Sequence, residues 1–151
     1  MAVTTGSHPF RLWVVTVSWQ EDEVWRVHFG RTGPAGPVHP LVRRYLMGQE
    51  VDLAGIGSPA DEGDGVSAAI YRAVRRVGYG EVATYGEIAD IVGTSPRAVG
   101  QAMARNPTPL VIPCHRIVSK KGLGGFTPSV EIKRDLLAME RAVCQGRKGR
   151  V

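Results

Sequence analysis

A segment of turn-forming residues, 54–65 (AGIGSPADEGDG), divides the chain into two parts whose apolar residues follow different periods. Before it, Leu12–Trp19 and Val24–Phe29 are rich in β-branched and aromatic residues, which predicts two strands joined by an acidic turn. His39–Leu53 is compatible with a short helix that has Tyr45 on its apolar side. This part of the chain therefore predicts a small sheet supported by one helix.

Helical periodicity begins at Val66, where Ile70 and Val74 open an apolar stripe. The predicted fold class is accordingly α/β (α+β). We expect a β-rich supporting domain with a short antiparallel sheet in residues 1–60, and a helical C-terminal domain in residues 61–151.

Two short helices joined by a tight turn are predicted next. Thr84 and Glu87 form a capping box that begins the first helix, and Gly93 ends it. Ser95 and Pro96 then begin the second, as an N-cap followed by proline at the first helical position. This is typical of a helix-turn-helix, winged-helix-like unit, although an ordinary pair of packed helices has the same pattern. The residues expected to face inward are Ile88, Ile91, Val92, Val99, Ala102 and Met103.

Gly100 lies inside the second of these helices, where glycine costs about 1 kcal/mol relative to alanine. Together with Ala98 it makes a small-residue face beside the long, charged Arg97. Such a face lets a helix approach another surface closely. DNA and a neighbouring helix explain it equally well.

Charge is distributed unevenly along the chain. Residues 1–65 carry five basic and eight acidic side chains, whereas residues 66–151 carry fourteen basic and six acidic ones. The basic half is compatible with a polyanionic partner, or simply with a solvated basic face. Because residues 1–10 lack a basic region followed by an apolar stretch, and no apolar run approaches the length of a membrane span, we expect an intracellular protein.

The two cysteines, Cys114 and Cys144, match no metal motif, and we expect both to be free thiols, although counting leaves a disulfide open. Cys114 follows an apolar run and stands in the sequence Pro113-Cys114-His115-Arg116. Neighbouring histidine and arginine favour the thiolate, which is the nucleophilic form. A buried structural cysteine with a chance histidine neighbour is the alternative reading.

The stretch Thr84–Phe126, TYGEIADIVGTSPRAVGQAMARNPTPLVIPCHRIVSKKGLGGF, closely resembles the O6-alkylguanine-DNA alkyltransferase family. The PCHR core is specific at this spacing from RAVG-x-A and Asn-Pro. The N-terminal part resembles the family only loosely, in the segment YLMGQEVDL. The resemblance implies single-turnover DNA repair, in which Cys114 receives an alkyl group from O6 of guanine. It also implies minor-groove binding and flipping of the damaged base into a pocket.

The resemblance further implies roles for five residues in the reaction. Cys114 would be activated through a water by His115, which Glu140 orients. Asn106 would brace the turn before the active-site strand, and Tyr85 would press on the phosphate backbone and donate a proton towards guanine. Read without the resemblance, Glu140 is a solvated glutamate near the end of a last helix that begins after Ser129.

DNA contacts are implied for Arg97, which would fill the gap left by the flipped base, and for Ala98, Gly100, Tyr85, Lys120 and Lys121. The pocket would include the backbone carbonyls of Cys114 and Ile117, together with Phe126 and Thr127. Phe126 stands where the family usually has tyrosine, and Pro128 where it usually has glycine, which leaves the range of adducts open.

The expected partner is double-stranded DNA carrying O6-alkylguanine, bound by a monomer with no cofactor, no metal and no membrane contact. We expect a cytoplasmic, nucleoid-associated protein, or a nuclear one in a eukaryote. The main alternative is a non-enzymatic sensor of alkylated DNA, which in relatives of this type lacks the cysteine. A plain helix-turn-helix regulator would not need PCHR, and a thiol hydrolase using Cys114 and His115 would show multiple turnover.

Overall fold

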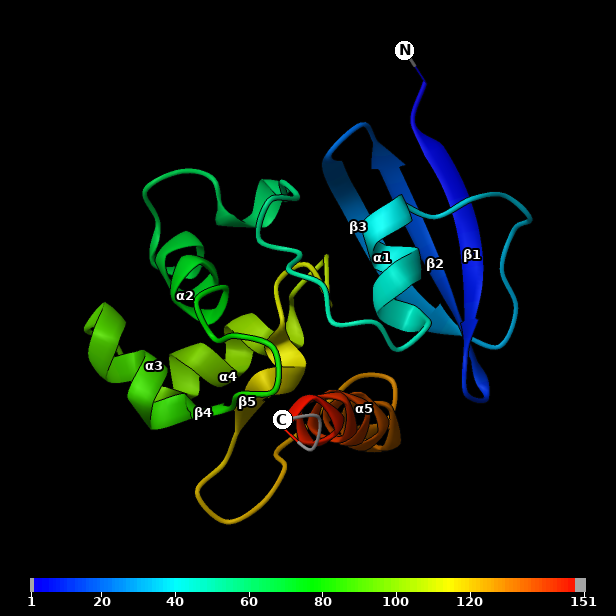
Figure 1. The fold of residues 1–151 in the computed structure, drawn as a ribbon. Helices are drawn as coiled ribbons and strands as arrows, with labels where there is room; N and C mark the ends of the chain where they lie inside the picture. The colour runs from blue at the N-terminus through cyan, green and yellow to red at the C-terminus, as the bar shows by residue number, and fades with distance from the viewer. Residues whose placement is uncertain (1, 149–151) are drawn as a thin grey trace.

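The computed structural model describes residues 2–148, which begin with a three-stranded antiparallel sheet (Figure 1). The strands are β1 (Thr4–Phe10), β2 (Trp13–Gln20) and β3 (Glu23–Gly30), in the order β1-β2-β3. Strands β2 and β3 confirm the predicted pair. Strand β1 was not predicted, because TTGSHPF has no apolar alternation and the strand is held by backbone pairing to β2.

One helix covers this sheet. Helix α1 (Pro40–Leu46) begins at His39, whose Nδ1 accepts a hydrogen bond from the Leu41 amide at 3.1 Å. The prediction that this helix reaches Leu53 was wrong. Gly48 adopts a φ of 88°, a left-handed conformation that does not continue a helix. The core beneath α1 contains Val15, Val17, Val24, Val27, Phe29, Val42, Tyr45 and Leu46.

The segment after α1 is anchored on both sides. Gly57 pairs with Glu23 of β3, and a short 3-10 turn, η1, spans Pro59–Asp61. Arg75 donates hydrogen bonds to backbone carbonyls at Leu53, Ala54 and Ile56 and to the carboxylate of Asp61. The core under the sheet also includes Leu110, Val111, Ile132 and Leu136 from the C-terminal half. The division at residues 60 and 61 stays a prediction.

Three helices form the second core. They are α2 (Val66–Val74), α3 (Tyr85–Val92) and α4 (Pro96–Ala104), which lie together on the other side of the molecule from the sheet (Figure 1). The capping box at the start of α3, the left-handed turn at Gly93 and the Ser95 cap of α4 confirm the predicted helix-turn-helix. The buried residues include Ile70, Tyr71, Val74, Ile88, Ala89, Val99, Ala102, Ile112 and Ile117.

Ile91 was expected to face inward and is 70% exposed, so that prediction was wrong. Ile88 and Ala89 define the buried side of α3, and Ile91 lies about 200° around the helix from Ala89. In a helix as short as α3, the apolar residues do not define one buried side from sequence alone. Packing against α2 and α4 determines which of them are buried.

The remaining elements link the two cores. A parallel pair joins β4 (Ala83–Thr84) to β5 (Ile117–Val118), the latter directly after the short turn η2 (Cys114–Arg116). Neither two-residue strand was predicted, because such short strands show no periodicity. The last helix, α5 (Val130–Lys148), is capped by Ser129, whose Oγ accepts from the Glu131 amide at 3.2 Å. Within residues 2–148, no helix is both long and apolar enough to cross a membrane.

Candidate active site

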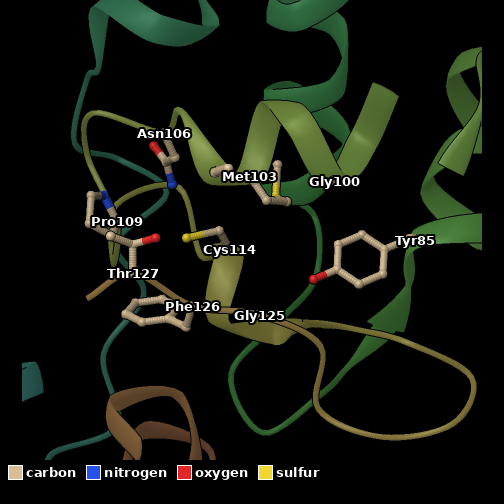
Figure 2. A pocket seen from close by; sticks show the side chains of 10 residues that line it. Tyr85, Gly100, Met103, Asn106, Pro109, Cys114, Gly125, Phe126 and Thr127 are labelled. Carbon is tan, nitrogen blue, oxygen red and sulfur yellow. The ribbon is translucent and has the colours of Figure 1, made fainter. Parts of the chain in front are cut away.

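Cys114 lies at the start of η2 and lines a cavity of about 230 Å³ (Figure 2). Its sulfur points into the space between Asn106 and Thr127, while the hydroxyl of Tyr85 faces in from the opposite side. Phe126 forms part of the wall and packs edge-on against Phe29 of β3, with ring centroids 5.6 Å apart. The cavity is lined by Tyr85, Gly100, Met103, Ala104, Asn106, Pro109, Cys114, Gly125, Phe126 and Thr127.

The turn that leads from α4 to the cysteine is held by Asn106. Its Nδ2 donates to the Ile112 carbonyl at 2.9 Å, and its Oδ1 accepts from the Thr108 amide at 3.0 Å. Within the turn, Leu110 adopts a φ of 78°, which is unfavourable for a residue with a side chain. Burial of the Leu110 side chain in the first core holds this strained backbone in place.

The protonation state of Cys114 differs from the sequence-based expectation. Burial raises the pKa of the Cys114 thiol, and the Asn106 side chain and Lys133 only partly oppose that effect. Arg116, expected to favour the thiolate, instead turns to Glu140, with its Nε 2.9 Å from Oε1. Burial therefore opposes the thiolate form that the two neighbours in sequence were expected to favour, and deprotonation of Cys114 calls for a base.

His115 and Glu140 form a buried pair behind the cysteine. His115 Nε2 lies 2.6 Å from Glu140 Oε2, and both side chains are completely buried. The structure therefore contradicts the reading of Glu140 as a solvated residue. Burial alone would raise the pKa of this carboxyl, but the hydrogen bonds from His115 and Arg116 and the positive charge of Arg116 hold the pKa at about 2. Gly80 adds a backbone amide donor at 2.9 Å.

This arrangement fixes the protonation of the imidazole. Burial lowers the pKa of His115 below its ordinary value, although the hydrogen bond and charge of Glu140 oppose that effect. Because Glu140 is an ionised acceptor, the His115 proton belongs on Nε2. Nδ1 is buried and has no hydrogen-bond partner among residues 2–148, so it is free to accept a proton.

Two further buried polar residues, which the sequence did not predict here, belong to this site. The Tyr45 hydroxyl, from α1, donates to Glu140 Oε2 and lies 3.2 Å from His115 Nε2. The sequence predicts Tyr45 only on the apolar side of a helix. Its partner Glu140 is 95 residues away, so no local signal identifies the contact.

Lys133 is the second missed residue. Its Nζ donates to the carbonyls of Ile117 at 2.5 Å and Gly125 at 3.2 Å, and burial lowers its pKa to about 8. Ile117 itself lies in the second core and does not line the cavity. A sequence signal was present, because Lys133 is placed at helical spacing on the same stripe as Leu136 and Leu137.

The surface of α4 next to the cavity is open. A Cβ built at Gly100 would meet no atom within 4 Å outside its own helix, so packing against another helix of this chain does not explain the glycine. Arg97 and Ala98 precede it on the same helix, and Arg97 is exposed. Gly100 is therefore on a face that can be approached closely from outside.

The loop between β5 and α5 borders the cavity from the other side. Lys120 and Lys121 are exposed in it and do not line the cavity. Gly124 has a φ of 76°, and a Cβ there would lie 2.7 Å from the Tyr85 hydroxyl oxygen. The loop backbone is thus pressed against Tyr85. Both Cys114 and Cys144 are free thiols, as expected.

Comparison with known proteins agrees with the sequence resemblance. A methylated-DNA–protein-cysteine methyltransferase from Metallosphaera sedula is 58% identical over 71 residues, which is 47% of this chain and 46% of the relative. The chain thus spans about half the length of these curated relatives.

Solved structures extend the similarity to the whole fold. An O6-methylguanine-DNA methyltransferase from Pyrococcus kodakaraensis aligns with a TM-score of 0.72 and 26% identity, over 92% of this chain and 99% of that one. The O6-methylguanine methyltransferase of Mycobacterium tuberculosis aligns with a TM-score of 0.75 and 24% identity, over 93% and 94%. Residues 66–142, just over half of the chain, match the sequence profile described as "6-O-methylguanine DNA methyltransferase, DNA binding domain". The chain therefore belongs to the 6-O-methylguanine DNA methyltransferase family.

Proposed function

We propose that this protein repairs alkylated DNA by transferring an alkyl group from O6 of guanine to its own Cys114, once per molecule. The observation that carries the proposal is the position of Cys114: it lines a cavity next to the open face of a helix-turn-helix, with a buried histidine–glutamate pair behind it. A sensor of alkylated DNA needs the cavity and the helix, but it does not need this nucleophile and base.

The chemistry begins with deprotonation of the Cys114 thiol. His115 Nδ1 takes the proton through a water, and Glu140 stabilises the imidazolium that forms. The thiolate then attacks the alkyl carbon, a carbon–sulfur bond forms, and the bond to O6 breaks. Tyr85, whose pKa is raised by burial, keeps its proton at neutral pH and donates it towards the departing guanine. The thioether product is stable, which limits each molecule to one turnover.

DNA binding is assigned to α4 and the surrounding basic surface. Gly100 and Ala98 let α4 press into the minor groove, and the exposed Arg97 occupies the place of the flipped base. Flipping is required because the O6-alkyl group is inaccessible within the base stack, and it costs less for a poorly paired, damaged base. The net positive charge of residues 66–151 supplies contacts to phosphate.

Stoichiometry tests the reaction. Incubation with excess duplex that carries radiolabelled O6-methylguanine is expected to label the protein up to one methyl group per molecule and no further. Cys114→Ala is expected to abolish labelling while duplex affinity stays within about twofold, because binding is independent of the thiol. Continued turnover, or labelling of the Cys114→Ala protein, would refute the proposal.

Arg97→Ala tests the flipping step separately. Without a side chain to fill the vacated stack, the flipped state is less populated, and we expect the transfer rate to fall at least tenfold. Gln101→Ala, a change at an exposed position on the same helix, is the matched control. Equal rates in both variants would remove Arg97 from this role. Rates are measured by rapid quench under single-turnover conditions.

A further inference from the structure

Tyr45 connects the N-terminal part of the chain to the buried histidine–glutamate pair. It lies on α1, is 1% exposed, and donates a hydrogen bond from its hydroxyl to Glu140 Oε2. The same hydroxyl oxygen lies 3.2 Å from His115 Nε2, so side chains from α1, η2 and α5 meet at this carboxylate oxygen. The ring is fixed independently, packing edge-on against Tyr79 with centroids 5.9 Å apart.

We propose that Tyr45 is a positioning residue for alkyl transfer, which acts through Glu140 to keep His115 neutral and correctly oriented as the base for Cys114. This inference rests on the proposed function for its kinetic consequence. It gives the N-terminal domain a role in the reaction itself, beyond support for the active-site domain.

The geometry explains how a hydroxyl that does not reach the cysteine can affect it. Glu140 Oε2 accepts from the Tyr45 hydroxyl, from His115 Nε2 and from Arg116 Nη2 at 3.1 Å. These donors fix the rotation of the carboxylate, which in turn fixes the plane of the imidazole and the direction of its Nδ1. Each of these hydrogen bonds also stabilises part of the negative charge on Oε2.

Removal of the Tyr45 hydroxyl strengthens the interaction between the Glu140 carboxylate and His115. The imidazolium form of His115 becomes more favourable, because the Glu140 carboxylate, no longer hydrogen-bonded by Tyr45, stabilises the positive charge more strongly. The other charged groups that act on His115 are Arg116, next to it in the chain, and Lys133, on α5; both favour the neutral form and remain unchanged. The net effect is a smaller fraction of neutral base at low pH.

Tyr45→Phe tests this with the ring packing preserved. The expected result is a single-turnover rate that falls about tenfold at pH 6 but less than threefold at pH 9, because the acid limb of the profile moves to higher pH. A loss of packing alone would lower the rate by the same factor at every pH. That uniform loss, or an unchanged profile, would overturn the proposal.

Tyr79→Phe is the matched control. Its hydroxyl is buried beside the same network but has no hydrogen-bond partner among the described residues, so its deletion removes a tyrosine hydroxyl without removing a bond to Glu140. We expect its pH profile to overlay that of the wild type. A shift equal to that of Tyr45→Phe would show that any nearby hydroxyl has this effect, and would contradict a specific role for Tyr45.

A titration of the free protein separates this inference from the proposed function. The four histidines are followed by NMR of their imidazole protons, and the His115 resonance is expected to titrate at higher pH in Tyr45→Phe than in the wild type or Tyr79→Phe. This readout needs no DNA and no transfer. An unmoved His115 titration refutes the positioning role, whereas absence of transfer in the wild type refutes the proposed function and leaves the titration informative.

A double-mutant cycle tests whether Tyr45 acts on His115 through the Glu140 carboxylate. If Tyr45 acts through the carboxylate, Tyr45→Phe should have no further effect on the His115 titration in a Glu140→Gln background, where the negative charge is already absent. A shift of the same size in both backgrounds would mean that Tyr45 acts on His115 directly, and would overturn the proposed route through Glu140.

Discussion

Replacement of Gly100 by alanine should raise the stability of this protein and weaken its binding to DNA. A Cβ at this position meets no atom within 4 Å outside its own helix, so the change removes the conformational cost of a helical glycine without creating a clash. The expected gain is about 0.5–1 kcal/mol in the free energy of unfolding, or roughly 1–4 °C in melting temperature for a chain of this size.

The same methyl group projects from the face of α4 that is proposed to enter the groove. A tightly fitted interface that must accommodate an extra methyl loses about 1–3 kcal/mol, which corresponds to a fall in affinity of about fivefold to 150-fold. Thermal unfolding and fluorescence anisotropy with a duplex containing O6-methylguanine measure the two effects on the same preparation.

Gly146→Ala provides the control. Gly146 lies near the end of α5 and also has no atom near a built Cβ, so alanine there should stabilise the helix modestly and leave DNA affinity unchanged. If Gly100→Ala binds DNA as tightly as the wild type, α4 does not make the close approach. If it lowers the melting temperature, Gly100 is required for the fold itself.

Two further variants test the pocket wall and the buried carboxylate. Gly124→Ala should lower the transfer rate at least tenfold in the quench assay, because its Cβ would lie 2.7 Å from the Tyr85 hydroxyl oxygen. Gly122→Ala is the control: its Cβ would meet no atom within 4 Å, so its rate should stay within about twofold of the wild type. Equal rates in the two variants would contradict contact between the loop and Tyr85. The folded-state pKa of Glu140, about 2, lies below its ordinary value of 4.5, so the unfolded chain binds more protons between these pH values. Glu140 should therefore contribute stability that is present above pH 4.5 and is lost as the pH falls towards 2. Urea unfolding of the Glu140→Gln variant should lack that acid-sensitive contribution, and an unchanged acid dependence would contradict the depressed pKa.

The helix-turn-helix could be predicted from the sequence because its signals are local. The capping box at Thr84 and Glu87, the stop at Gly93 and the Ser95 cap each act within one turn of helix, and the structure reproduces all of them. Strand β1 and the β4–β5 pair escaped prediction for the opposite reason. Their stability depends on backbone partners elsewhere in the chain, which their own composition does not identify.

The same contrast between local sequence signals and distant contacts applies to the active site. Cys114 and Glu140 were identified through a family resemblance, and the structure places Glu140 against His115 in a buried pair. The direction of the Arg116 side chain and the contribution of Tyr45 could not be predicted, because both depend on tertiary contacts with residues distant in sequence. Adjacent residues in a chain often point to opposite sides, so adjacency in PCHR was a poor guide to which groups act on the thiol.

Mass spectrometry tests most directly whether Cys114 accepts the alkyl group. The protein is incubated with a duplex that contains one O6-methylguanine, its intact mass is measured, and the modified peptide is mapped. We expect a gain of one methyl group, located on Cys114 and complete at one equivalent of lesion. An unchanged mass under reducing conditions, despite tight binding of the damaged duplex, would contradict it and identify the protein as a sensor.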